Sequence, residues 1–151
     1  MITIDALKDK IENNSRLLGL DMGSKRIGVS ICDDRRKIAT PYKTIEFINI
    51  ENLIFDLSNI VKENHIFGII IGNPVNMDGS FGKSAQSIQD RAKLIGNKIN
   101  IPVCLWDERM STSAAYNLSS NLDIKFSLKK KKIDEKAATF ILQGAIDYLN
   151  N

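Results

Sequence analysis

An apolar run that stops at a carboxylate constrains this chain more than any other feature. The run from Leu17 to Leu20 is followed directly by Asp21, and a turn at Gly23 leads into a second apolar run. Short runs of this composition, bounded by turn residues, are typical of buried strands. An unpaired carboxylate at the end of a buried strand is costly, so Asp21 needs a hydrogen-bond donor, a cation or a metal ion. The alternative is that Asp21 only begins the turn.

The succession of apolar patterns predicts an α/β fold. We expect strands over 16–22, 26–33, 37–46, 67–72 and 102–106, and helices over 4–13, 49–64, 83–98, 111–121 and 134–149. Pro41 favours an edge position for the third strand, and the fully apolar run from Phe67 to Gly72 indicates a central parallel strand. Three strands in a meander, followed by alternating helix and strand, predict a mixed five-stranded sheet with helices on both faces, in one domain over residues 1–151.

The composition limits the classes of protein without selecting one. The chain is 43% hydrophobic and 26% charged with a net charge of +3, which is compatible with a polyanionic partner and does not require one. No apolar run approaches the roughly 18 residues of a membrane span, and the charged N-terminus argues against an export signal. We expect a cytoplasmic protein that does not bind membranes. Cys32 and Cys104 are then reduced core thiols, although a pair remains open.

Further carboxylates stand where other predicted elements begin or end. Asp107 and Glu108 close the last strand, and Asp134 begins the last helix. Local explanations are open, since Asp134 is a good N-cap residue and the other two acids could pair with Arg109. Positions three or four residues apart on a helix share a face, so Asp134 shares one with an apolar stripe and should point toward the sheet. The stripe consists of Ala138, Ile141, Ala145 and Leu149.

If these segments meet, their carboxylates need a compensating charge. Two carboxylates about 4 Å apart repel by roughly 4 kcal/mol at an effective dielectric constant near 20. An all-oxygen cluster suits Mg²⁺ or Mn²⁺. The chain has one histidine, His65, and no cysteine cluster, which argues against zinc.

Four segments of the sequence resemble the motifs of the YqgF/RuvX family. They are Gly19–Val29 (GLDMGSKRIGV), Gly72–Ser80 (GNPVNMDGS), Trp106–Thr112 (WDERMST) and Lys129–Gln143, in which a lysine run precedes Ile133-Asp134. The match covers nearly the whole chain in the family's order. Asn73 stands where the family usually has Leu, a departure that we expect to affect loop packing and not the chemistry.

The resemblance implies a ribonuclease H-like fold and metal-dependent phosphodiester hydrolysis, with Asp21, Glu108 and Asp134 as the acidic triad. In such chemistry one ion activates the attacking water and a second stabilises the leaving oxygen. Asp21 would bridge the ions, and the other two acids would each hold one side. Neighbouring residues of a strand face opposite ways, which leaves Asp107 as a reserve ligand.

Basic residues beside the acids are candidates for binding phosphate. Lys25, Arg26 and Arg109 follow the acids closely in sequence, although the first two could equally only flank the turn. A lysine run directly before Asp134 could guide a nucleic-acid backbone, although such a run is usually a solvated loop. The run consists of Lys129, Lys130, Lys131 and Lys132.

The function expected from the resemblance is a Mg²⁺- or Mn²⁺-dependent nuclease that processes the 5′ end of precursor 16S ribosomal RNA. A resolvase of Holliday junctions in branched DNA is the close alternative. It would need paired sites from a symmetric dimer, so both monomer and homodimer are open. An actin-like ATPase would need a second half of the fold, and a non-catalytic nucleic-acid-binding module would not need all the acids.

Overall fold

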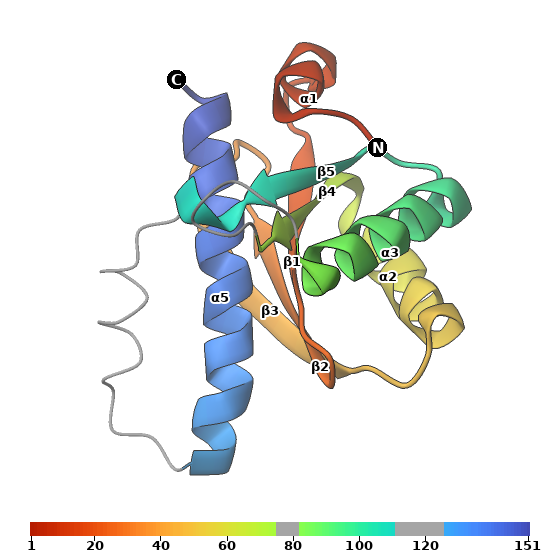
Figure 1. The fold of residues 1–151 in the computed structure, drawn as a ribbon. Coiled ribbons are helices and arrows are strands. Elements are labelled where there is room, and N and C mark those ends of the chain that lie inside the picture. Colours follow the sequence, from red (N-terminus) through yellow and green to blue (C-terminus); the bar gives the residue numbers. More distant parts are fainter. Residues whose placement is uncertain (75–81, 111–125) are drawn as a thin grey trace.

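A five-stranded mixed sheet forms the centre of the structure, a computed structural model that describes residues 1–74, 82–110 and 126–151 (Figure 1). The strands are β1 (Arg16–Met22), β2 (Arg26–Cys32), β3 (Ala39–Glu46), β4 (Ile66–Asn73) and β5 (Val103–Asp107). Their order across the sheet is β3-β2-β1-β4-β5. β2 is antiparallel to both β1 and β3, whereas β4 is parallel to β1 and β5. The predicted mixed sheet is confirmed, with β3 at an edge as Pro41 indicated.

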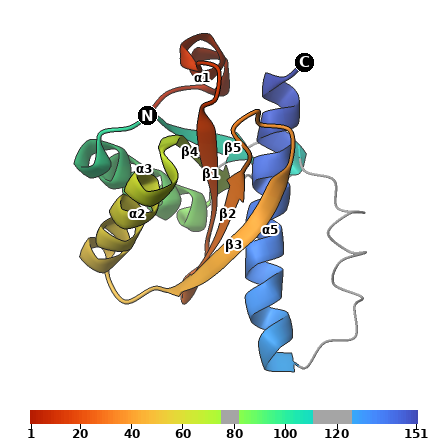
Figure 2. The ribbon, with the colours of Figure 1, turned by 180° about the vertical axis from the view of Figure 1, so that it is seen from behind.

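Helices cover both faces of this sheet, as expected (Figures 1 and 2). They are α1 (Ile4–Lys10), α2 (Ile50–Asn64), α3 (Lys83–Ile99), α5 (Phe126–Leu149) and the short 3₁₀ helix η1 (Glu108–Met110). α2 and α3 lie on one face, and α5 crosses the other face with α1 beside it. Successive residues of β1 divide between the two apolar cores, since Leu18 packs on the α2–α3 side and Leu17 on the α5 side. Burial on both faces explains why β1 and β4 read as nearly continuous apolar runs.

Small residues in the sheet let α5 lie close to it. The Ser30 hydroxyl of β2 donates a hydrogen bond of 2.7 Å to the backbone carbonyl of Ala138 in α5. A side-chain carbon at Gly28 would collide with the carbonyl group of Asp134. The middle of α5 is therefore fixed against β2 by main-chain contact.

The start of α5 differs from the prediction. The helix begins at Phe126 and not at 134, so Asp134 lies inside it and is not its N-cap. No Gly or Pro interrupts the sequence between Phe126 and Asp134, and lysine is a good helix former, so nothing in the lysine run ends the helix. The predicted start of the last helix at 134 was therefore wrong, since the backbone of the lysine run is helical, while the side chains of the run lie outside the described residues. The buried stripe is confirmed, because Ala138, Ile141, Ala145 and Leu149 are all buried.

Most other boundaries agree closely with the predicted ones. Apart from the start of α5, the largest difference is at the first helix, because α1 ends at Lys10 and not at 13. The helix expected over 111–121 lies outside the described residues. Cys32 and Cys104 are free and buried, as predicted. None of the helices in the described part of the chain combines the length and the apolar character needed to cross a bilayer.

Candidate active site

Three elements bring the predicted acids to one face of the sheet. Asp21, near the end of β1, lies opposite Gly28 of β2 in the antiparallel register, so both positions face the same side. The backbone of Asp134 lies against Gly28 from α5, and the Glu108 carboxylate lies over Gly72 of β4, where an added Cβ would be 3.1 Å from Oε1. β2 and β4 are the two neighbours of β1. Asp134 and Glu108 therefore flank Asp21 from either side.

The electrostatics of Asp21 reflect this convergence. Partial burial, and then the negative charges of Glu108 and Asp134 in that order, together raise its pKa to about 7. The pKa of Glu108 is also raised, by burial first and by Asp107 second. Near neutral pH the central carboxyl is thus poised between its charged and neutral forms. A cation placed among these groups would favour the charged form.

Asp134 points inward, as its stripe predicted, but its carboxylate is held by a basic residue. The Nε–H group of Arg26 donates to its Oδ2 over 2.8 Å, and the two side chains are 34% and 21% exposed. Arg26 is the first residue of β2, so it does more than flank the turn. Lys25 is exposed in that turn, and its carbonyl accepts a hydrogen bond from the backbone of Phe47.

Asp107 pairs locally with Arg109, the alternative left open from the sequence. The guanidinium Nη2 lies 2.7 Å from Oδ2 of Asp107, and the backbone N–H of Arg109 donates to Oδ1 over 2.9 Å. These contacts lower the pKa of Asp107. Asp107 and Glu108 therefore sit in opposite environments although they are adjacent in sequence. Glu108 belongs with the half-buried acids around Asp21, and Asp107 does not.

The donor atoms suit a hard divalent cation, although the described side chains do not yet form a closed ligand set. Among residues 1–74, 82–110 and 126–151, no three Asp, Glu, His or Cys side chains are grouped closely enough to hold one metal ion. In this arrangement the carboxylate of Asp134 is turned to Arg26. Three carboxylates with oxygen donors alone are nevertheless the kind of ligands that Mg²⁺ and Mn²⁺ prefer. By the chemistry of its donors, the site fits such an ion.

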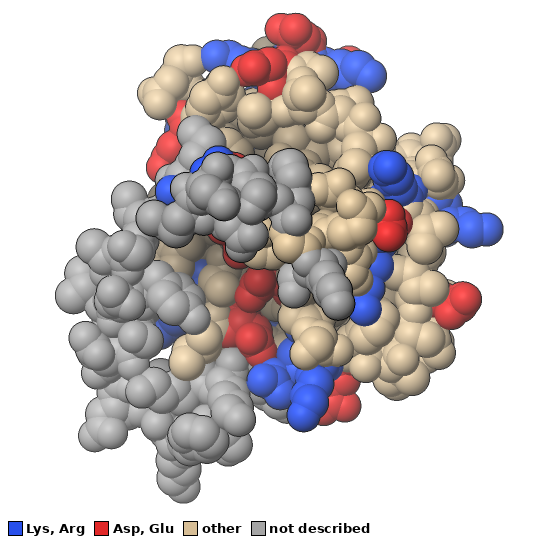
Figure 3. All heavy atoms as spheres, viewed as in Figure 1, with Lys and Arg blue, Asp and Glu red and all other residues tan. Residues whose placement is uncertain are grey.

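One face of the molecule shows acidic side chains in a recess (Figure 3). Figure 3 shows acidic side chains in a hollow between α5 and α3, with Lys and Arg side chains bordering it. Acidic residues at the centre can hold cations, and the basic residues around them attract phosphate groups. This distribution of charge suits a nucleic-acid backbone.

Sequence reasoning missed the small residues that position the acids. Gly28 admits the backbone of Asp134, and Gly72 admits the side chains of Glu108 and Ile141. A readable signal existed, because glycine inside a strand often marks a close approach of another segment. Asn73, the departure from the family pattern, ends β4 with 6% exposure, and its amide oxygen has no hydrogen-bond partner among the residues that the structure describes. The packing role expected for it stays a prediction.

The sheet order and the placement of the helices define a ribonuclease H-like fold, and solved structures confirm this class. RuvC from T. thermophilus, in complex with a Holliday junction substrate, superimposes with a TM-score of 0.59 at 8% identity, covering 91% of this chain and 97% of that one. The yeast mitochondrial Holliday junction resolvase Ydc2 gives a TM-score of 0.54 at 14% identity, with 97% and 84% covered. At these identities the likeness shows the fold alone.

The chain belongs to the RuvX family, described as Holliday junction resolvase, which it matches over residues 15–148. A relative from Pelagibacter ubique is 61% identical over 151 residues, covering 100% of both chains. A relative from Rhizobium meliloti is 38% identical over 149 residues, covering 99% of this chain and 90% of that one. Both relatives carry a name that proposes a pre-16S rRNA nuclease.

Proposed function

We propose that this protein is a divalent-metal-dependent nuclease that processes the 5′ end of precursor 16S ribosomal RNA in the cytoplasm. The names of its relatives support this RNA substrate, and the ribonuclease H-like fold supports phosphodiester cleavage. One observation carries the proposal. Asp21 lies near the end of a central strand with its pKa raised to about 7, and acids placed beside both neighbouring strands contribute to that shift.

Asp21, Glu108 and Asp134 are the residues that would hold Mg²⁺ or Mn²⁺. Bound ions of this kind lower the pKa of the attacking water and stabilise charge on the leaving oxygen. Asp21 is half-buried, and the reduced access of water strengthens the charge interactions around it.

Basic residues around the acids are proposed to bind the nucleic-acid backbone. Lys25 is exposed in the β1–β2 turn and can contact a phosphate directly. Arg109 is held by Asp107, so binding a phosphate would compete with that ion pair. The lysines at positions 129–132 precede Asp134 on the same helix and are proposed to contact the RNA farther from the cleavage site.

Resolution of Holliday junctions is the second candidate, favoured by the family description and by the likeness to RuvC. Cutting a four-way junction symmetrically requires two equivalent sites, and hence a dimer related by a two-fold axis. Cleavage of single RNA strands has no such requirement. The oligomeric state in solution therefore bears on the choice between the two substrates.

A side-by-side cleavage assay tests the proposal. The purified protein is incubated with an RNA that carries the 5′ extension of 16S rRNA, and separately with a four-way DNA junction, with Mg²⁺ or with EDTA. We expect cleavage of the RNA in Mg²⁺ only. Cleavage of the junction alone would reverse the substrate assignment. If neither nucleic acid is cut at saturating Mg²⁺ or Mn²⁺, the nuclease proposal fails.

A further inference from the structure

We propose that Arg26 is a resident counter-cation of Asp134, which a divalent ion must displace before the acidic site closes. The inference rests on the proposed function and concerns how that same site assembles. It assigns two alternating partners to one carboxylate: the guanidinium before the ion binds, and the ion afterwards. The released guanidinium could then serve the phosphate-binding role expected from the sequence.

The fold holds the two residues of this ion pair next to each other. It joins residues 108 positions apart in the chain through a hydrogen bond of 2.8 Å from Nε to Oδ2. Both side chains are largely shielded, at 34% and 21% exposure. The backbones beneath them are locked together, because Asp134 lies on Gly28 and the Ser30 hydroxyl binds the carbonyl of Ala138. Main-chain packing therefore holds Arg26 and Asp134 in reach of each other.

Arg26 and a metal ion compete for the same carboxylate. A charge-assisted hydrogen bond occupies Oδ2, and a guanidinium next to a divalent ion would suffer strong like-charge repulsion. This competition accounts for a site whose donors suit a cation while its described acids do not form a ligand set of three. Arginine stays charged at any physiological pH, so a cation and not a change in pH must exchange the partners.

Lys25 provides a matched control. It is the adjacent residue, carries the same charge and is exposed, and it makes no ion pair within the described part of the chain. Lys25→Gln removes one positive charge near the acids without touching Asp134. Arg26→Gln removes one charge and the contact as well. The difference between the two variants isolates the competition from the general effect of charge.

The first measurement uses the unmodified protein. In a ¹⁵N-labelled sample, the Nε–H resonance of Arg26 is assigned by its loss in Arg26→Gln and followed while Mg²⁺ is added. We expect this resonance to move as Mg²⁺ saturates the site, because its hydrogen bond to Asp134 is broken. A resonance that does not move, in a sample whose neighbouring amides report Mg²⁺ binding, overturns the inference.

The second measurement is Mn²⁺ affinity, determined by electron paramagnetic resonance for the wild type, Arg26→Gln, Lys25→Gln and the conservative Arg26→Lys. We expect Arg26→Gln to bind Mn²⁺ about 5-fold more tightly than Lys25→Gln, the size of a partly exposed ion pair. Arg26→Lys should fall between Arg26→Gln and the wild type. Thermal melting confirms that each variant is folded.

The outcomes separate this inference from the proposed function. If Mn²⁺ binds to none of the four folded proteins, the metal-dependent nuclease itself is wrong. If Mn²⁺ binds equally well to both Gln variants, Arg26 does not compete for Asp134. If Arg26→Gln binds Mn²⁺ more weakly than Lys25→Gln, Arg26 orients Asp134 for the ion instead of blocking it, which also overturns the inference.

Discussion

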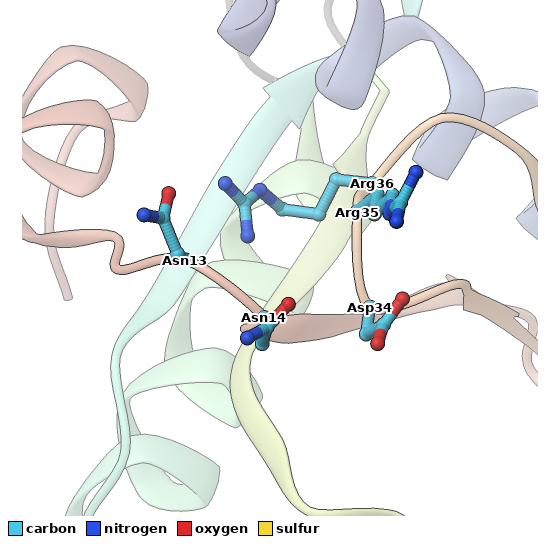
Figure 4. Close-up of a pocket in the computed structure, with 5 residues that line it drawn as sticks. All are labelled: Asn13, Asn14, Asp34, Arg35 and Arg36. Atoms are coloured by element: carbon cyan, nitrogen blue, oxygen red, sulfur yellow. The ribbon is translucent and has the colours of Figure 1, made fainter.

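The two ends of the sheet differ in whether their charged side chains have hydrogen-bond partners. At the turn after β2, Asp33 Oδ1 accepts hydrogen bonds of 2.7 and 2.9 Å from the backbone amides of Lys37 and Ile38. Arg36 donates to two backbone carbonyls of segment 12–15, over 3.1 and 2.8 Å. A pocket of about 360 Å³ lies here, lined by Asn13, Asn14, Asp34, Arg35 and Arg36 (Figure 4).

At the other end, two of the acids lack such donors among the described residues. Within the described residues, the carboxylates of Asp21 and Glu108 accept no hydrogen bond, and the pKa of each is raised. The pKa of Asp33 is lowered, chiefly by the backbone amide of Ile38. The comparison teaches that an aspartate at a strand end is structural when nearby amides satisfy it. An aspartate left facing other acids is poised to bind a cation.

The largest expected effect comes from Asp21→Asn. Removing the central ligand should lower metal-dependent RNA cleavage by roughly 1,000-fold or more, since a catalytic ion contributes several kcal/mol. Cleavage rates at saturating Mg²⁺ measure this loss, and circular dichroism confirms that the fold persists. Asp33→Asn, at the opposite end, is the matched control and should keep full activity. Full activity in Asp21→Asn would remove Asp21 from the mechanism.

The next effect is on stability against pH in the absence of metal. The unfolded chain ionises Asp21 near 3.8 while the folded protein keeps the proton until about 7. The contribution of Asp21 to stability is therefore full below about pH 4 and is lost as the pH rises to 7, by about 4 kcal/mol at most. Urea unfolding in EDTA from pH 4 to 8 measures it as the difference between wild type and Asp21→Asn. A difference that stays constant with pH would contradict the raised pKa.

Gly72→Ala should have a moderate effect on both stability and activity. The new Cβ would lie 2.5 Å from Ile141 Cδ1 and 3.1 Å from Glu108 Oε1, so both side chains must move. We expect a loss of about 1–3 kcal/mol in the free energy of unfolding and slower cleavage. Gly96→Ala is the control, because its Cβ would meet Val103 at 3.3 Å, and it should keep normal cleavage. Equal activities in the two variants would show that Gly72 does not position Glu108.

The smallest effect is expected for Arg36→Gly at the far end. Arg36 has a left-handed backbone with φ of 53°, which glycine adopts more easily, while the substitution loses two hydrogen bonds to carbonyls. These effects oppose each other, so stability should change by less than about 1 kcal/mol, and activity should not change. Urea unfolding and cleavage assays measure both. A marked loss of RNA binding would mean that the pocket in Figure 4 contacts substrate, which would break the comparison.

Much of the fold could be predicted because its signals are local. The continuous apolar run at 67–72 indicated a strand covered on both faces, and β4 is such a strand. Pro41 indicated the edge strand, since proline cannot donate to a neighbouring strand. The start of α5 could not be predicted in this way. The residues before Asp134 suit an exposed loop and an exposed helix equally well. No Gly or Pro there marks where a helix would begin.

The sequence indicated which acidic residues to consider for the candidate site, but not which partners their side chains have in the structure. Carboxylates where apolar elements begin or end indicated Asp21, Asp134 and the pair Asp107 and Glu108, and the family resemblance selected Glu108 from that pair. The structure brings Asp21, Glu108 and Asp134 to one face of the sheet. The pairing of Arg26 with Asp134 depends on the register between β2 and a helix more than a hundred residues later. No local pattern encodes that register, because it is set by how α5 settles on the sheet.

The bare backbone of Gly28 has a consequence for how accurately the site is built. Because the carbonyl of Asp134 rests on Gly28, directly across from Asp21, main-chain packing sets the separation of the two backbones, and only side-chain torsions move the carboxylates. The two backbones cannot move apart unless this part of α5 lifts away from the sheet. The spacing of the two backbones therefore depends on how rigid the sheet is.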